Sequence, residues 1–302
     1  MKIWLLFPVL LVFMRSFSQQ ISDTSYHPPI PEPAYQPGKG PVVFIDEGHH
    51  NFHTKDGRYQ SFSNLLERDG YTVKGYQGMF ETDRLSKGKI LVISNALNEM
   101  NVQNWYLPTP SAFTQSEIDQ VKTWVLEGGS LFLIADHMPM AGAASQLAAA
   151  FGFEFSNGFV LHPVSGGTAS FNVKEKTLAE NTITLGRNDG EKVTQVVSFT
   201  GQCFRIPQEA VSILTFGENY ENFLTDTAWV FNEKTPRSTI KGWSQGAYRT
   251  FGKGRVVVSG EAAMFTAQLA GPQSIRVGMN HSEAAQNYRL LLNIIHWLDW
   301  KL

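Results

Sequence analysis

The chain has 302 residues, of which 42% are hydrophobic, 12% aromatic and 17% charged. This composition is typical of one globular domain, with or without an insertion, and excludes disordered, collagen-like and coiled-coil chains. Its 27 acidic and 25 basic residues give a formal net charge of −2, and no stretch after the N-terminus gathers five basic residues. A phosphate-neutralising surface is therefore missing, and nucleic acid is not expected as a partner.

The N-terminus has the order of a secretory leader. Lys2 precedes an apolar run over 3–14, and small residues before Gln19 provide a cleavage sequence, so Met1–Ser18 is predicted to be a signal peptide. The mature protein is then expected in the periplasm or outside the cell. The run is too short to span a bilayer and no later run reaches about 18 residues, so no transmembrane segment is expected after the leader. Arg15, close to the cleavage sequence, leaves an uncleaved anchor open.

The next segment is rich in proline and the whole chain is poor in cysteine. Residues 26–41 hold six of the 14 prolines, which predicts an extended tether over 19–40 ahead of a single domain over 41–302. Cys203 is the only cysteine, so no intramolecular disulfide can form, and it is expected to pack as a small buried hydrophobe.

Strand and helix patterns alternate through the first half of the domain. Apolar runs predict strands and 3.6-residue periodicity predicts helices, and Thr114 with Glu117 forms a capping box at the start of one helix. This alternation predicts a parallel α/β sheet. The predicted strands cover 42–46, 71–74, 89–94 and 130–135, and the helices cover 59–68, the segment from Thr114 to Gly128, and 141–151.

The pattern changes over residues 152–252. Period-two alternation over 193–199 and several glycine turn signals predict antiparallel hairpins inserted into the sheet domain. A buried strand returns at 254–261, and a helix over 283–300 closes the chain. Residues 252–254, Gly-Lys-Gly, are predicted to form a tight turn between antiparallel strands rather than a phosphate-binding loop. The expected fold is thus a flavodoxin-like parallel sheet flanked by helices, with an antiparallel β-rich insertion.

Ionisable and amide side chains gather where the predicted parallel strands end. Ligands of open α/β sheets sit beyond these carboxyl ends, and neighbouring strands bring such groups together. We therefore expect His49 or His53 to share one pocket with His137 and Glu261. The side chains concerned are Asp46, Glu47, His49, Asn51 and His53 after the first strand, Asn95 after the third, Asp136 and His137 after the fourth, and Glu261 after the late strand.

Two chemistries are open for this set. Asp46, His49 and His53 are candidate ligands of zinc, manganese or iron, although no established metal-binding motif contains them. Alternatively, the site works without metal, by acid and base catalysis. Structural roles as helix caps, turn residues or ion-pair partners also remain open for each residue. The candidate catalytic residues are Glu47, Asp136, His137 and Glu261, and the candidate substrate-binding residues are Asn51, Asn95 and Asn280.

Four segments together resemble a known superfold. They are Phe44–Glu47, Ile134–His137, Gly252–Glu261 and Asn293–Leu298. The chain is similar over 41–151 and 252–302 to the class I glutamine-amidotransferase-like proteins, near the trehalose-utilisation (ThuA-like) branch. This resemblance implies a site with a nucleophilic cysteine at the turn after a central strand, but Asp136 and His137 occupy that turn here. Since neither side chain can form the thioester, glutamine amidotransferase activity is not expected.

Two functions follow from these residues. The first is an exported hydrolase or carbohydrate-active enzyme, whose sugar would stack on aromatic rings. The alternative is a non-catalytic member of the superfold that binds a small ligand or glycan, which accounts for the missing nucleophile. The aromatic residues expected at the sugar site are Trp105, Tyr106, Trp229 and Trp243.

Overall fold

A computed structural model describes residues 20–302, so the predicted signal peptide lies outside the described residues. Within this range nine strands form one sheet in the order β3-β2-β4-β5-β15-β14-β10-β6, with β11 also paired to β14. The strands are β2 (Val42–Asp46), β3 (Thr72–Tyr76), β4 (Ile90–Ser94), β5 (Ser130–Ile134), β6 (Glu154–Phe155), β10 (Phe204–Arg205), β11 (Val211–Thr215), β14 (Ser244–Phe251) and β15 (Gly254–Ser259).

The first half of this sheet is parallel. β3, β2, β4, β5 and β15 all run in the same direction, and the late strand β15 lies beside β5 with Val257 opposite Phe132. Among the parallel strands the chain order across the sheet is second, first, third, fourth, fifth, which is the order of flavodoxin-like sheets. The predicted parallel core is therefore present, and the strand order reverses between β2 and β4.

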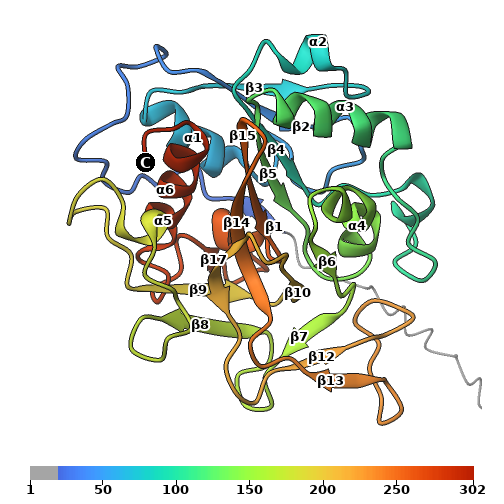
Figure 1. Ribbon diagram of the computed structural model, residues 1–302. Coiled ribbons are helices and arrows are strands. Elements are labelled where there is room, and N and C mark those ends of the chain that lie inside the picture. Colours follow the sequence, from blue (N-terminus) through green and yellow to red (C-terminus); the bar gives the residue numbers. More distant parts are fainter. Residues whose placement is uncertain (1–19) are drawn as a thin grey trace, which may run out of the picture.

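Helices cover both faces of the parallel strands. Figure 1 shows α1 and α6 on one side of the sheet and α3 and α4 on the other. The capping box predicted at Thr114 is formed, since Thr114 accepts from the backbone of Glu117 and the Glu117 side chain accepts in return. The helices are α1 (Gln60–Arg68), α2 (Thr82–Leu85), α3 (Gln115–Leu126), α4 (Met140–Ala150), α5 (Thr182–Leu185) and α6 (Asn287–Leu298), with short 3₁₀ turns η1 (Glu99–Asn101) and η2 (Ala263–Phe265).

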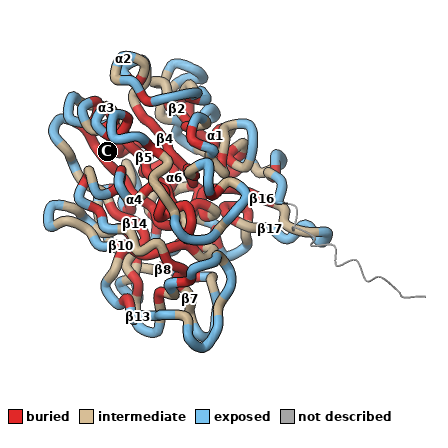
Figure 2. Tube along the Cα trace, turned by 90° about the vertical axis from the view of Figure 1, so that its right-hand side faces the viewer, coloured by how far each residue is buried: buried red, intermediate tan, exposed pale blue. Residues whose placement is uncertain are grey.

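The buried strands feed two cores because successive side chains point to opposite faces. Phe132 and Ile134 of β5 join the core beneath α1 and α6, whereas Leu131 and Leu133 join the core beneath α3 and α4. Figure 2 shows this buried region running through the central strands, with exposed loops outside it. This two-sided burial explains why the predicted strands are continuous apolar runs rather than alternating ones.

Residues 152–252 extend the sheet beyond β15 and add small sheets beside it. β14 forms a hairpin with β15, and Gly252 turns the chain between them with φ of 59°, so the Gly-Lys-Gly segment is a turn. Figure 1 shows β7, β12 and β13 at the lower end of the molecule. The additional strands pair as β13 (Arg237–Thr239), β12 (Glu221–Phe223) and β7 (Phe159–Leu161) in one sheet, and as β8 (Thr168–Asn172) with β9 (Gln195–Phe199) in another.

The proline-rich segment, predicted to be an extended tether ahead of the domain, contacts the domain. β1 (Gln20–Ser22) pairs with β16 (Ala267–Ala270), which in turn pairs with β17 (Ile275–Gly278). Side chains of α1 and of the insertion also hold the segment, because Arg68 donates to the carbonyl of Pro28 and Arg187 donates to that of Glu32. Among residues 20–302 no helix is long and apolar enough to cross a membrane.

Candidate functional site

The loops at the carboxyl ends of the parallel strands are joined by hydrogen bonds. Asn95, directly after β4, accepts from the amide of Phe52 at 2.9 Å through its backbone carbonyl and from the amide of Asp136 at 2.8 Å through its side chain. Its φ of 48° is one that asparagine tolerates better than most residues. Asn95 was predicted to bind substrate; in the structure its side chain binds the β5 loop and its backbone carbonyl binds the β2 loop, at the point where the strand order reverses.

His49 lies between two buried carboxylates. Its Nδ1 is 2.9 and 3.0 Å from the two oxygens of Asp46, and its Nε2 is 2.8 Å from Oε1 of Glu117. Although burial opposes a charged ring, the hydrogen bonds and charges of Asp46 and Glu117 raise the pKa of His49. The two carboxylates thus favour the charged ring, which donates to both acids and in that form has no lone pair to offer a metal ion.

The remaining donors around Asp46 are also committed. Asn51 donates to Oδ2 of Asp46 at 2.9 Å, and its own side-chain oxygen accepts from the amide of His49. The amide of Gly48 donates to Oδ1 of Asp46 at 3.1 Å. Asp46, His49 and Asn51, predicted as metal or substrate contacts, therefore form a closed network that fixes the loop after β2.

His53 is buried in a different environment. Its ring packs on that of Tyr59 with centroids 4.7 Å apart, and its Nδ1 is buried without a hydrogen-bond partner. Burial and the nearby charge of Arg58 lower the pKa of His53 to about 3. His53 does not join Asp46 and His49, and among residues 20–302 no group of three histidine, cysteine or acidic side chains is arranged to hold a metal ion.

Glu261, directly after β15, is fully buried. Its Oε1 accepts from the amide of Ala263 and its Oε2 from the amide of Met264, both at 2.7 Å, at the start of η2. Burial, together with the charge of Asp136, raises the pKa of Glu261 well above its usual range, against the effect of the amide donors. The charge of Asp136 thus acts on Glu261, whose carboxylate is directed at the protein backbone.

Two predicted residues lie away from this group. Glu47 turns toward the β3 side, where it accepts from the amide of Lys55 and from the side chain of Gln77, both at 2.8 Å. Asn280, after β17, donates to the carboxylate of Asp23, directly after β1, at 3.0 Å. Glu47 thus holds loops together, and Asn280 anchors the N-terminal strand.

His137 differs from the other predicted residues because aromatic rings surround it. The ring stacks on Phe159 with centroids 4.1 Å apart, and Trp229 meets it edge-on at 4.7 Å. Trp105 lies 6.2 Å away on another side. Its Nδ1 is 2.7 Å from the carbonyl oxygen of Met138, and since a carbonyl only accepts, Nδ1 carries the proton. In the neutral ring the lone pair is therefore on Nε2.

Two of the four aromatic residues predicted at a sugar site, Trp105 and Trp229, contact this histidine, and a third, Tyr106, follows Trp105 in the chain. Trp105 and Tyr106 lie on one loop and Trp229 on another, joined by a hydrogen bond from the amide of Ala228 to the carbonyl of Trp105 at 2.8 Å. Trp229 is 53% and Tyr106 47% exposed. We call Trp105, Tyr106, Trp229 and His137 the aromatic surface. Trp243 lies elsewhere, beneath the guanidinium of Arg205.

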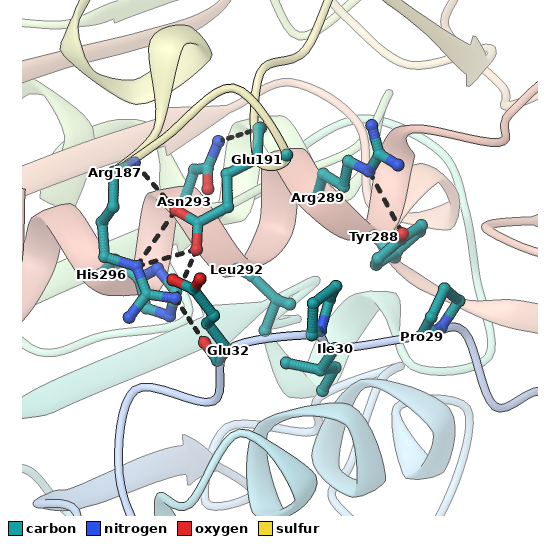
Figure 3. Close-up of a pocket in the computed structure, with 12 residues that line it drawn as sticks. Pro29, Ile30, Glu32, Arg187, Glu191, Tyr288, Arg289, Leu292, Asn293 and His296 are labelled. Carbon is teal, nitrogen blue, oxygen red and sulfur yellow. Dashed lines mark hydrogen bonds and ion pairs between the residues drawn. The ribbon is translucent and has the colours of Figure 1, made fainter.

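Two cavities lie near the N-terminal segment. One of about 30 Å³ lies between residues 29–32 and α6, where Arg187 pairs with Glu191 beside the buried His296 (Figure 3). That volume holds about one water molecule. A second cavity of about 380 Å³ is bordered by Asp23 and Asn280.

Cys203 is buried, which raises its thiol pKa to about 12, so it supplies no thiolate.

Glu117, Phe159 and Arg58 were not among the residues predicted for the site. Glu117 was recognised only as part of a helix cap, although the same carboxylate also binds His49. Phe159 carries no sequence signal for contact with His137, because it lies in the insertion. Arg58 lies in the loop between β2 and α1. A basic residue in a loop at the carboxyl end of a strand is a sequence signal that could have identified it.

Comparisons with known proteins show likeness in fold alone. No protein-family model matches the sequence, and no curated protein matches it either. The mmIFT52 N-terminal domain is 14% identical with a TM-score of 0.60, over 85% of this chain and 97% of that one. A ThuA-like protein from Bacteroides uniformis is 11% identical with a TM-score of 0.50, over 87% of this chain and 94% of that one. The chain therefore has a mixed α/β fold similar to that of a ThuA-like protein.

Proposed function

We propose that this protein binds carbohydrate at the aromatic surface without catalysing a reaction on it. The observation that supports this function is the contact of exposed Trp229 with His137, beside the loop that holds Trp105 and exposed Tyr106; Nε2 of His137 can accept a hydrogen bond from a sugar hydroxyl. Flat aromatic side chains offer a large apolar face, and an amphipathic ring such as a pyranose has both an apolar face and hydroxyl groups. Small-molecule sites are usually lined by apolar and aromatic side chains with a few polar groups among them.

Binding is favoured over hydrolysis because the candidate acids are already occupied. Hydrolysis of a glycosidic bond ordinarily needs two carboxyl groups that flank it. Asp46 and Glu261 are fully buried and accept hydrogen bonds from the protein, and Glu47 faces the β3 side. Of the predicted carboxylates at the strand ends, only Asp136 is both beside His137 and partly exposed.

A hydrolase is the second candidate, and one observation favours it. His137 has its proton on Nδ1, which leaves Nε2 as a base for a water molecule, and Asp136 is its neighbour in the chain.

The parallel strand order also supports membership of the glutamine-amidotransferase-like superfold, with Asp136 and His137 after β5 in place of a cysteine. Export of the mature protein belongs to the same proposal and is motivated by the sequence of Met1–Ser18.

A binding screen with two tryptophan variants tests the proposal. The mature protein is applied to an array of neutral and acidic glycans, and the best ligand is titrated by calorimetry into wild type, Trp229→Ala and Trp300→Ala. Trp300 is the matched control, because it is 50% exposed with φ of 64°, close to the 53% and 65° of Trp229. Trp300 stacks on the guanidinium of Arg255. Arg255 pairs with Ser130 at the start of β15 and β5, which is the opposite end of these strands from His137.

We expect Trp229→Ala to weaken binding at least tenfold and Trp300→Ala to leave it unchanged. Equal binding by both variants, or no ligand on the array, would contradict the proposal. Incubation of the same glycans with wild type and His137→Ala, followed by product analysis, separates the candidates. Release of products by wild type alone would replace the binding function with the hydrolase.

A further inference from the structure

Arg58 is a cation without an acidic partner. Its guanidinium lies 3.7 Å from the centroid of the Phe52 ring, and Nη1 donates a long hydrogen bond of 3.4 Å to the Phe52 carbonyl. Its Nε is buried with no hydrogen-bond partner. Among residues 20–302 no carboxylate lies within 4.0 Å of the guanidinium nitrogens.

The surroundings of Arg58 make this charge costly. The side chain is partly buried between the β2 loop and α1, and that burial lowers the pKa of Arg58. Arginine nevertheless stays protonated at neutral pH, so the folded protein keeps a partly desolvated positive charge there. Desolvating a charge is unfavourable unless a partner of opposite sign restores the lost interaction. The neighbouring His53 is neutral and provides no such partner.

A row of aromatic rings connects Arg58 with the aromatic surface. The Phe52 ring beneath the guanidinium meets the Trp105 ring at 5.6 Å in an edge-on contact. Trp105 is in turn the ring 6.2 Å from His137. The guanidinium thus lies two ring contacts away from the candidate sugar site, at the end where the loop after β2 meets the loop after β4.

We propose that Arg58 makes the aromatic surface selective for saccharides that carry an anionic group, such as the carboxylate of a uronic acid. The inference rests on the proposed function and adds the ligand class to it. The planar fork of N–H donors on arginine matches the two oxygens of a carboxylate and also binds a sulfate group. One sugar unit of the saccharide contacts the aromatic surface while the charged substituent of a neighbouring unit binds Arg58.

The test compares ligands that differ in charge but not in ring. Tetragalacturonate, its fully methyl-esterified form and a sulfated galactan tetrasaccharide are titrated into wild type, Arg58→Gln and Arg84→Gln. Arg84 is the matched control, because its guanidinium also lies over a ring, that of Tyr76, on the β3 side of the sheet. Each variant is checked for wild-type Tm before titration.

We expect the acid to bind wild type roughly tenfold or more tightly than its ester, as a hydrogen-bonded charge pair would give. Arg58→Gln should remove that difference and Arg84→Gln should keep it. Binding of the sulfated ligand that depends on Arg58 would support the same inference and identify sulfate as a second source of the anion. The comparison of acid with ester on wild type needs no variant. Equal affinity for the two would therefore overturn the inference even if Arg58→Gln does not fold.

Two results would overturn the inference, and they differ in what they say of the proposed function. Equal affinity for acid and ester, with both lost in Trp229→Ala, would refute selection by Arg58 while supporting carbohydrate binding. No binding of any of the three ligands, together with a silent glycan array, would overturn both.

Discussion

Replacing His49 with alanine is expected to destabilise the protein strongly without touching the aromatic surface. The substitution removes the shared donor of Asp46 and Glu117, which are 0% and 3% exposed, and leaves two carboxylates in a buried site. The ring also packs on Phe80 and Phe113 with centroids 4.5 and 4.9 Å away, so these contacts are lost as well.

The size of the effect follows from what the two acids retain. Removing one partner of a buried pair typically costs about 3–5 kcal/mol. Asp46 keeps the amide of Gly48 and the side chain of Asn51, and Glu117 keeps the amides of Phe80 and Thr114. These donors favour the lower end, about 3 kcal/mol, which for a domain of this size lowers Tm by roughly 6–12 °C.

Thermal unfolding of wild type, His49→Ala and His50→Asn measures this prediction. His50 is the control because it is exposed, and asparagine tolerates its φ of 47°. A histidine with a raised folded pKa stabilises the protein below its unfolded pKa of about 6.5, and this contribution is lost as the pH rises through the folded value. The gap between wild type and His49→Ala should therefore narrow in alkaline buffer. A loss below 1 kcal/mol, or a gap independent of pH, would refute the imidazolium bridge.

Three further substitutions test other parts of the structure. The pKa of His53 is lowered to about 3, so its neutral burial is compatible with folding above the unfolded pKa of about 6.5 and opposes folding below it. Between pH 7 and 5.5 the wild type should therefore lose about 1 kcal/mol more stability than His53→Leu in urea titrations. The same pH dependence of stability in both proteins would contradict neutral burial. Thr114→Ala should cost about 1 kcal/mol, measured by thermal unfolding, because it removes the capping box that also orients Glu117; an unchanged Tm would contradict this. Gly201→Ala should cost about 3 kcal/mol, measured the same way, because φ is 109° and the new Cβ would lie 2.3 Å from the carbonyl oxygen of Gly260; a fully stable variant would show that the loop shifts.

Local patterns were sufficient to predict the parallel half of the fold. The strand 130–134 lies within the predicted 130–135, and the predicted return of a parallel strand near 254 is met by β15 pairing with β5. Both are buried on both faces and so are continuous apolar runs. The contacts of the proline-rich segment were not predictable in this way. They depend on Arg68 and Arg187, which are far from that segment in the sequence.

The common edge of the strand ends was predictable, whereas the contacts of the side chains there were not. Parallel strands send their carboxyl ends to one edge, and β2, β4, β5 and β15 are parallel neighbours in the sheet. Residue type alone did not show that His49 would be held by Glu117, which is 68 positions away, or that backbone amides would occupy Glu261. The surroundings of His137 likewise come from the insertion, through Phe159 and Trp229.

Carbohydrate binding at the aromatic surface is tested most directly by observing the tryptophan indoles during titration. Protein labelled with ¹⁵N at tryptophan is titrated with the best saccharide from the array, and each indole N–H signal is assigned by single substitution. We expect the signals of Trp105 and Trp229 to shift with one common Kd, while those of Trp243 and Trp300 stay in place. Shifts confined to Trp243 or Trp300, or none at saturating ligand, would contradict a binding site at the aromatic surface.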